Sequence, residues 1–208
     1  MKYKWLNNTK NKKIIIFFNG WGMDENVINH LDCEDYDVLM FYDYNTLDTD
    51  FDFSLLNIYL EKNIIAWSMG VMVGGNYLIE QNLSPYLQTV AINGTLKPID
   101  AEYGIHPKIY DLTIKGFNEK GREKFINSMF DKKQDILCSR EIENQKNELI
   151  ALKNYRCNND FRYNKILISD NDKIIPTKSQ VAFWNQKPNL KGGHCPFFSF
   201  TKWSELLW

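Results

Sequence analysis

The sequence predicts an α/β fold in which a mostly parallel sheet of about six or seven strands carries helices on both faces. Short β-branched and aromatic runs alternate with segments whose apolar residues recur at helical spacing. Such alternation is typical of parallel strands connected by helices. The 208 residues, of which 44% are hydrophobic, suffice for one domain with its own core, residues 1–208.

The predicted strands are apolar runs that stop at polar or glycine-containing turns. The first, IIIFF, ends at Asn19-Gly20, which indicates a buried strand. The predicted strands cover residues 14–18, 36–42, 63–67, 87–93 and 165–169, with a short one near 188–190.

The predicted helices fill the intervals between these strands. They cover residues 24–31 with Asp24 as a candidate cap, 53–60, 71–81, 177–185 and 201–208. After the fourth strand, a polar and helical stretch of about 60 residues, 99–160, is expected to form a small helical lid insertion, with 118–130 and 139–155 as its better segments.

Charge and composition exclude several classes of protein. The chain has 25 Lys and Arg against 26 Asp and Glu. It therefore lacks the basic excess of a duplex-binding protein, and no nucleic-acid partner is expected. The apolar run Ile14–Phe18 is too short for a membrane span or a signal peptide, so we expect no membrane partner. Because Cys33, Cys138, Cys157 and Cys195 form no Cys-x-x-Cys pair, a cytoplasmic protein with reduced thiols is expected.

Ser68 lies in the segment AWSMG, between a predicted strand and a predicted helix. A serine on such a sharp turn projects its hydroxyl above the sheet, and the residues two before and two after it must be small. Ala66 and Gly70 meet this demand, although Ala66 replaces the first glycine of the common G-x-S-x-G pattern. Ser68 is therefore a predicted nucleophile; the alternative is a loop serine that caps the following helix.

Three histidines are available to act as the base for this serine. His30 falls within a predicted helix, and His106 precedes Pro107 in a turn, where a histidine is usually structural. His194 follows two glycines and precedes a proline by two positions, which indicates a shaped loop that aims the ring. We predict His194 as the base, with a purely structural loop histidine as the alternative.

The base needs a carboxylate to orient it, and two candidates follow the strand at 165–169. Asp172 begins an Asp-x-x-x-Pro segment in the loop beyond the strand, from which it can reach His194. Asp170 is nearer the strand end and is more typical of a turn or a helix cap, but it stays open as an alternative. The order Ser68, Asp172, His194 is the chain order of the α/β-hydrolases.

Two backbone N–H groups are expected to stabilise the oxyanion. The first belongs to Met69, directly after the nucleophile. The second is expected from the loop Asn19–Gly22, because its glycines allow the backbone to approach a substrate closely. Taken alone, this loop would be interpreted as a simple tight turn.

With these residues identified, the chain resembles the short BioG-type esterases of biotin synthesis, which cleave the methyl ester of pimeloyl-acyl-carrier protein. The segments AINGTLKPID (91–100) and GIHPKIYDLT (104–113) are the more specific ones. The segments FFNGWG (17–22), AWSMGV (66–71) and GGHCPF (192–197) complete the resemblance, while the stretch 131–160 adds little.

The resemblance implies an α/β-hydrolase that needs neither a metal nor an organic cofactor. It implies Ser68 as nucleophile, His194 as base, Asp172 as its partner, the Trp21 and Met69 amides as oxyanion donors, and Phe125 against the acyl chain. Asn19 stands where many hydrolases have His-Gly, which should matter little because the donor is the amide of the residue two positions on. The short N-terminus implies that the usual first two antiparallel strands are absent or reduced to one, near Lys2–Leu6.

The partner implied by the resemblance is acyl carrier protein bearing the pimeloyl methyl ester. Because that carrier is acidic, the basic residues of the insertion are a candidate docking surface, with a solvated helix face as the alternative. They are Lys115, Lys120, Arg122, Lys124, Lys132, Lys133 and Arg140. A generalist short-chain carboxylesterase or thioesterase, and a non-catalytic hydrolase-fold binding protein, remain open as other functions. The oligomeric state also stays open, with a monomer as the expectation.

Overall fold

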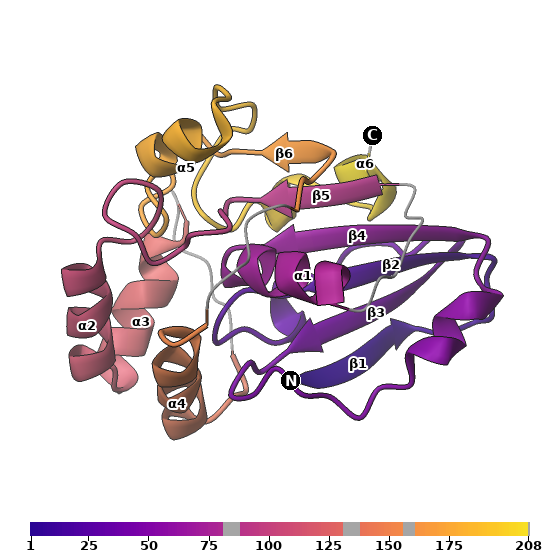
Figure 1. Ribbon diagram of the computed structural model, residues 1–208, viewed down its shortest axis with the longest axis horizontal. Coiled ribbons are helices and arrows are strands. Elements are labelled where there is room, and N and C mark those ends of the chain that lie inside the picture. Colours follow the sequence, from indigo (N-terminus) through magenta and orange to yellow (C-terminus); the bar gives the residue numbers. More distant parts are fainter. Residues whose placement is uncertain (81–87, 131–137, 156–160, 208) are drawn as a thin grey trace.

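A six-stranded sheet with the order β1-β3-β2-β4-β5-β6 forms the centre of the molecule (Figure 1). The structure is a computed structural model that describes residues 1–80, 88–130, 138–155 and 161–207. The strands are β1 (Lys2–Asn7), β2 (Lys13–Phe18), β3 (Tyr36–Tyr42), β4 (Glu61–Trp67), β5 (Gln88–Ile92) and β6 (Lys165–Leu167). Only the pair β1–β3 is antiparallel among these strands. The mostly parallel sheet is thereby confirmed, and a single strand precedes β2.

The described part of the chain contains six α-helices. They are α1 (Met69–Glu80), α2 (Pro107–Gly116), α3 (Glu119–Ser128), α4 (Ile142–Leu152), α5 (Thr177–Trp184) and α6 (Ser204–Leu207). Residues of α1 pack in one hydrophobic cluster and residues of α6 in a second one, so the sheet has helices on both faces, as predicted.

The central strand β2 supplies both hydrophobic clusters. Ile14, Ile16 and Phe18 belong to the cluster that contains α1. Ile15 and Phe17 belong to the cluster that contains α6. Side chains of a strand alternate between the two faces of a sheet, and a strand covered on both faces is apolar throughout. The continuous IIIFF run is therefore explained by burial of β2 on both sides.

Two predicted helices are wrong in type and length. Residues 24–31 form only a 3-10 turn at Glu25–Val27, capped by Asp24, because the two asparagines in this segment are poor helix formers. Residues 53–60 form a 3-10 turn at Phe53–Ile58. This turn cannot continue, since the Leu60 amide donates to the Lys12 carbonyl, where the chain enters β4. The strand expected near 188–190 is reduced to one bridge between Ser169 and Leu190.

The helices α2, α3 and α4 come from the segment between β5 and β6, where the lid insertion is expected. Figure 1 places them together beyond the carboxyl ends of the parallel strands. Ligands of open α/β sheets bind outside these strand ends. Residues 131–137 and 156–160 of the insertion, with Lys132, Lys133 and Cys157, lie outside the described residues.

Candidate active site

Ser68 occupies a sharp turn between the last residue of β4 and the first residue of α1. Its φ of 59° lies in the left-handed region, which is strained for a residue with a side chain. The turn is tight: a Cβ at Gly70 would lie 2.3 Å from the carbonyl oxygen of Phe18. Ala66 is fully buried where β4 pairs with Phe18 of β2. The small residues at both positions are thus a requirement of the fold around Ser68.

Ser68, His194 and Asp172 form one continuous chain of hydrogen bonds. The Ser68 hydroxyl lies 2.8 Å from His194 Nε2, and His194 Nδ1 lies 2.7 Å from Asp172 Oδ2. All three are at most 5% exposed. A serine whose hydroxyl meets an imidazole, itself held by a carboxylate, is the arrangement that activates a nucleophile for acyl transfer.

Asp172 makes the carboxylate contact to His194, and Asp170 lies outside this chain of bonds. Asp172 Oδ1 accepts from the backbone N–H groups of Ile174 and Ile175, and its Oδ2 also accepts from Gln180 Nε2. Asp170 instead pairs with Lys191 at the surface, over 2.7 Å. No pattern in the sequence indicated that Gln180 would donate to Asp172.

The loop that carries His194 is held through its backbone, by hydrogen bonds to the His194 carbonyl and by a close approach at Gly193. The His194 carbonyl accepts from Trp67 Nε1 and from Asn93 Nδ2, both over 2.9 Å. A Cβ at Gly193 would lie 2.5 Å from the carbonyl oxygen of Met129, so only glycine allows this approach. Asn93 and Trp67 lie in segments that carry the family resemblance, yet their hydrogen-bonding roles were not predicted.

The other two histidines lie apart from this site. His30 is exposed and stacks on the ring of Phe198. His106 caps α2, because its Nδ1 accepts from the backbone N–H of Lys108.

The expected oxyanion donors lie on both sides of Ser68. The N–H of Met69 is the first of α1, and helix N-termini favour negative charge. Trp21 follows Gly20, where a Cβ would meet the Trp67 ring at 2.8 Å, so the loop passes close to the nucleophile turn. Within the described residues, the backbone N–H groups of Trp21 and Met69 donate to no acceptor. Asn19 closes the turn, since its Oδ1 accepts from the Gly20 amide.

A cavity of about 110 Å³ opens beside Ser68. It is mainly apolar, and the rings of Trp21 and Phe125 meet over it with centroids 4.6 Å apart. Its lining comprises Trp21, Ser68, Met69, Ile105, Ile109, Tyr110, Thr113, Phe125, Leu149, Lys173 and Ile174. The sequence singled out Ser68, Trp21, Met69 and Phe125 but missed the others, because they come from segments far apart in the chain.

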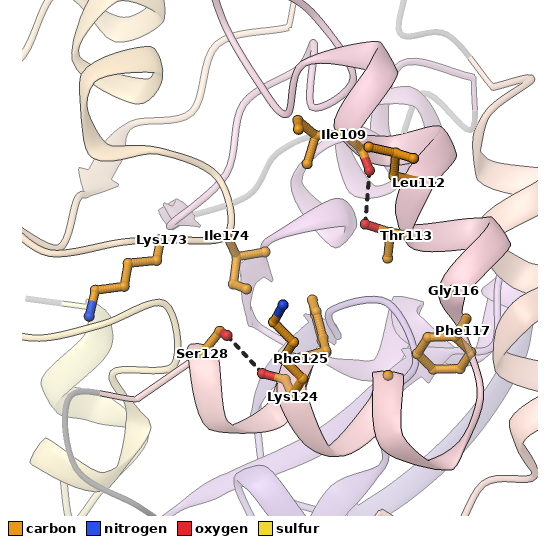
Figure 2. A pocket seen from close by; sticks show the side chains of 11 residues that line it. Ile109, Leu112, Thr113, Gly116, Phe117, Lys124, Phe125, Ser128, Lys173 and Ile174 are labelled. Atoms are coloured by element: carbon orange, nitrogen blue, oxygen red, sulfur yellow. Dashed lines mark hydrogen bonds between the residues drawn. The ribbon is translucent and has the colours of Figure 1, made fainter.

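A second, wider groove of about 460 Å³ continues from this cavity between α2 and α3 (Figure 2). The two hollows share Ile109, Thr113, Phe125, Lys173 and Ile174. Figure 2 shows the Lys124 amine directed into the groove and the Lys173 amine directed away from it. The site therefore has an apolar inner cavity at Ser68 and a larger outer groove into which the Lys124 amine is directed.

The candidate docking surface needs one correction. Arg140 is only 9% exposed and forms ion pairs with Glu148 and Asp43, so it cannot meet a partner at the surface. It is buried because the guanidinium neutralises two carboxylates inside the molecule. Arg122 is half-buried and donates to the Arg140 carbonyl. Lys115, Lys120 and Lys124 remain exposed.

Two further features bear on function. Across the described ranges, no group of three or more His, Cys, Asp or Glu side chains is placed to hold a metal ion. In the same ranges, no helix combines the length and apolar character that a bilayer crossing requires.

Comparisons with known proteins give the family and the fold of this chain. A family model described as pimeloyl-ACP methyl esterase BioG matches residues 1–206. The crystal structure of BioG from Haemophilus influenzae superposes with a TM-score of 0.88 and 30% identity, over 100% of both chains. A putative aryl esterase from Burkholderia cenocepacia, 14% identical, shares the fold with a TM-score of 0.66 over 95% of this chain and 88% of its own.

A Bacteroides fragilis protein named malonyl-[acyl-carrier protein] O-methyltransferase is 37% identical over 187 residues. The match covers 86% of this chain but only 38% of that protein, so this chain corresponds to a minor part of its length. The esterase neighbours and the parallel sheet together establish the α/β-hydrolase fold. Since the family model extends over nearly the whole sequence and includes Ser68, Asp172 and His194, the chain belongs to the BioG family of pimeloyl-ACP methyl esterases.

Proposed function

We propose that this protein hydrolyses the methyl ester of pimeloyl-acyl-carrier protein to free pimeloyl-carrier protein and methanol, in the synthesis of the biotin precursor. The observation that carries the proposal is the hydrogen-bonded chain from Ser68 through His194 to Asp172, which opens into an apolar cavity. Membership of the BioG family supplies the substrate class. The Bacteroides relative is named for O-methylation of a carrier-bound acyl group, which is the modification that a methyl esterase removes.

The proposed reaction proceeds through an acyl-enzyme. Ser68 Oγ attacks the ester carbonyl while His194 Nε2 takes its proton, and Asp172 stabilises the imidazolium that forms. The amides of Trp21 and Met69 hold the oxyanion of the tetrahedral intermediate. Methanol leaves with the proton from His194. Water, deprotonated in turn by His194, then releases the new carboxylate and restores Ser68.

The shape of the site supports a carrier-bound substrate. The methyl ester lies at the end of the acyl chain remote from the carrier, so the chain must run outward from Ser68. The inner cavity, with Phe125 on its wall, suits the methylene chain. The groove between α2 and α3 suits the more polar arm of the carrier, and Lys124 is directed into it. In this proposal α2, α3 and α4 act as the lid.

The carrier itself is proposed to dock on the exposed face of α2 and α3. Lys115, Lys120 and Lys124 supply positive charge there, and Ile109 and Leu112 are 56% and 62% exposed beside the groove. An acidic carrier would be steered to such a face by charge and held by apolar contact. A cytoplasmic monomer that needs no cofactor, nucleic acid or membrane is consistent with this proposal.

The decisive experiment is hydrolysis of pimeloyl-carrier-protein methyl ester by the purified protein, beside Ser68→Ala. We expect rapid release of free pimeloyl-carrier protein that the variant abolishes. Equal rates on the carrier-bound ester and on a small free ester would favour the generalist esterase or thioesterase. Failure of a fluorophosphonate probe to label Ser68 would favour the non-catalytic binding protein.

A further inference from the structure

The loop that carries Trp21 is tied to α4 of the insertion by three hydrogen bonds. Gly22 N–H donates to Glu148 Oε2 over 3.1 Å, and the Gly22 carbonyl accepts from Gln145 Nε2 over 2.7 Å. The indole Nε1 of Trp21 donates to the Gln145 carbonyl over 2.8 Å. Both partners belong to α4, more than 120 residues along the chain. The helix therefore holds the peptide groups that follow Trp21.

Glu148 is fully buried and has a partner for each oxygen. Its Oε1 accepts from the Tyr44 amide over 2.9 Å, and its Oε2 accepts from Arg140 Nη1 over 2.7 Å as well as from Gly22. Burial raises the pKa of Glu148, while the Arg140 guanidinium and the Tyr44 amide act in the opposite direction. A buried carboxylate is expensive unless its bonds are all made. One of the bonds to Glu148 comes from Gly22 N–H, in the loop of the candidate oxyanion hole.

We propose that Glu148 is a positioning residue for ester hydrolysis, because it fixes the orientation of the loop that presents the Trp21 amide to the developing oxyanion. The inference rests on the proposed function of Ser68 and the Trp21 amide. Gly22 has a φ of 73°, and glycine offers this backbone more freedom than other residues do. The tether from α4 removes that freedom. Stabilisation by an oxyanion hole depends on donors already in place before the charge develops.

The role predicts a specific kinetic signature. An interaction that matters only when the oxyanion forms lowers kcat when it is lost and leaves the KM of the ester almost unchanged. We expect Glu148→Gln to lower kcat about 10- to 100-fold, because glutamine has one acceptor oxygen where the carboxylate uses two, so the Gly22 and Tyr44 amides and Arg140 can no longer all be satisfied. Gln145→Leu, which removes the second tether, should act in the same direction with a smaller loss.

The test uses the full chain and a short chromogenic ester, p-nitrophenyl butyrate, which needs no carrier. Active sites are counted by stoichiometric fluorophosphonate labelling, so that rates refer to folded enzyme only. A phenylboronic acid, which forms a tetrahedral adduct with an active serine, serves as a second readout. Its inhibition constant should rise in Glu148→Gln in parallel with the loss of kcat/KM.

Asp43→Asn is the matched control. Asp43 contacts the same buried Arg140 but makes no hydrogen bond to residues 19–24. We expect this variant to lower the melting temperature while kcat stays within about twofold. If Asp43→Asn lowered kcat as much as Glu148→Gln, the positioning role would be overturned. The loss of a buried carboxylate charge beside Arg140 would then explain both results.

The remaining outcomes separate the two proposals. Ser68-dependent turnover that survives in Glu148→Gln and Gln145→Leu would overturn the positioning role alone. A wild-type protein without Ser68-dependent turnover would overturn the proposed function and this role with it. If Glu148→Gln does not fold, Gln145→Leu decides by the same criteria of kcat and boronate inhibition.

Discussion

The indole nitrogen of Trp67 donates to the carbonyl oxygen of His194 over 2.9 Å. The residue that precedes the candidate nucleophile therefore fixes the backbone of the candidate base. We expect Trp67→Phe to reduce kcat severalfold and to lower stability by about 1 kcal/mol, since one hydrogen bond to a buried carbonyl is lost. Kinetics and thermal unfolding would measure both. Trp5→Phe, at a half-buried site packed on Phe51, should leave kcat unchanged.

The two aspartates of the loop after β6 should behave differently on removal of charge. Asp172→Asn should lower kcat by about 10³- to 10⁴-fold, because His194 loses the carboxylate that sets its tautomer and stabilises its charged form. Asp170→Asn removes a surface pair with Lys191 but keeps an oxygen to accept from the Gly192 amide, so kcat should change by less than about twofold. Steady-state rates on a small ester decide between them; similar rates for the two variants would contradict the assignment of Asp172.

Phe125 should matter for long substrates more than for short ones. Phe125→Ala removes part of the apolar wall of the inner cavity, so the KM of the pimeloyl substrate should rise about tenfold. The KM of an acetyl ester should rise less, because its chain is too short to reach the ring. Phe198→Ala, at a side chain that stacks on His30 away from the cavity, is the control for losing a phenyl group.

Charge on α3 should affect the carrier-bound substrate only. Lys120→Glu combined with Lys124→Glu should raise the KM of the carrier-bound ester severalfold, and the increase should shrink at high salt. Both lysines are exposed, whereas Arg122 also donates to the Arg140 carbonyl and is unsuitable for reversal. A small free ester should be unaffected. Lys12→Glu, placed before β2 at the opposite end of the strands, should leave both substrates unchanged.

Acid should destabilise the protein partly through Asp43. Burial alone would raise the pKa of this carboxyl, but hydrogen bonds from Lys2 and Asn45, with the Arg140 charge, lower it from 3.8 to about 2. A lowered folded-state pKa stabilises the protein above about pH 4, and this contribution, up to about 2 kcal/mol, disappears as the pH falls toward about 2. Denaturant unfolding at stepwise pH would measure it. Asp43→Asn should be less stable at neutral pH and show a shallower decline; parallel declines would contradict the prediction.

The sequence predicted the local features well because short segments determine them. The buried strand at 14–18 and the turn at Ser68 follow from residue types within a few neighbouring positions. The helix expected at 24–31 was wrong for an equally local reason, since its two asparagines are poor helix formers and only the 3-10 turn at Glu25–Val27 forms.

Contacts between distant segments could not be predicted. Gly22 and Glu148 are 126 positions apart, and neither carries a pattern that indicates the other. For the same reason Arg140 was assigned to a surface, although its two carboxylate partners hold it inside. The lining of the cavity by Tyr110, Leu149 and Ile174 likewise depends on how α2, α4 and the loop after β6 come together.

The distance along the chain between Ser68 and His194 has a consequence for biosynthesis. The elements that flank the turn at Ser68, which are β2, β4, β5 and α1, all precede residue 93. The imidazole follows the serine by 126 positions, so the contact between them is among the longest-range in the described part of the molecule. Contacts of high sequence separation form late, because closing long loops carries an entropy penalty. In the proposed mechanism, a nascent chain that ends before His194 lacks its base, so hydrolysis can begin only after that histidine has emerged from the ribosome.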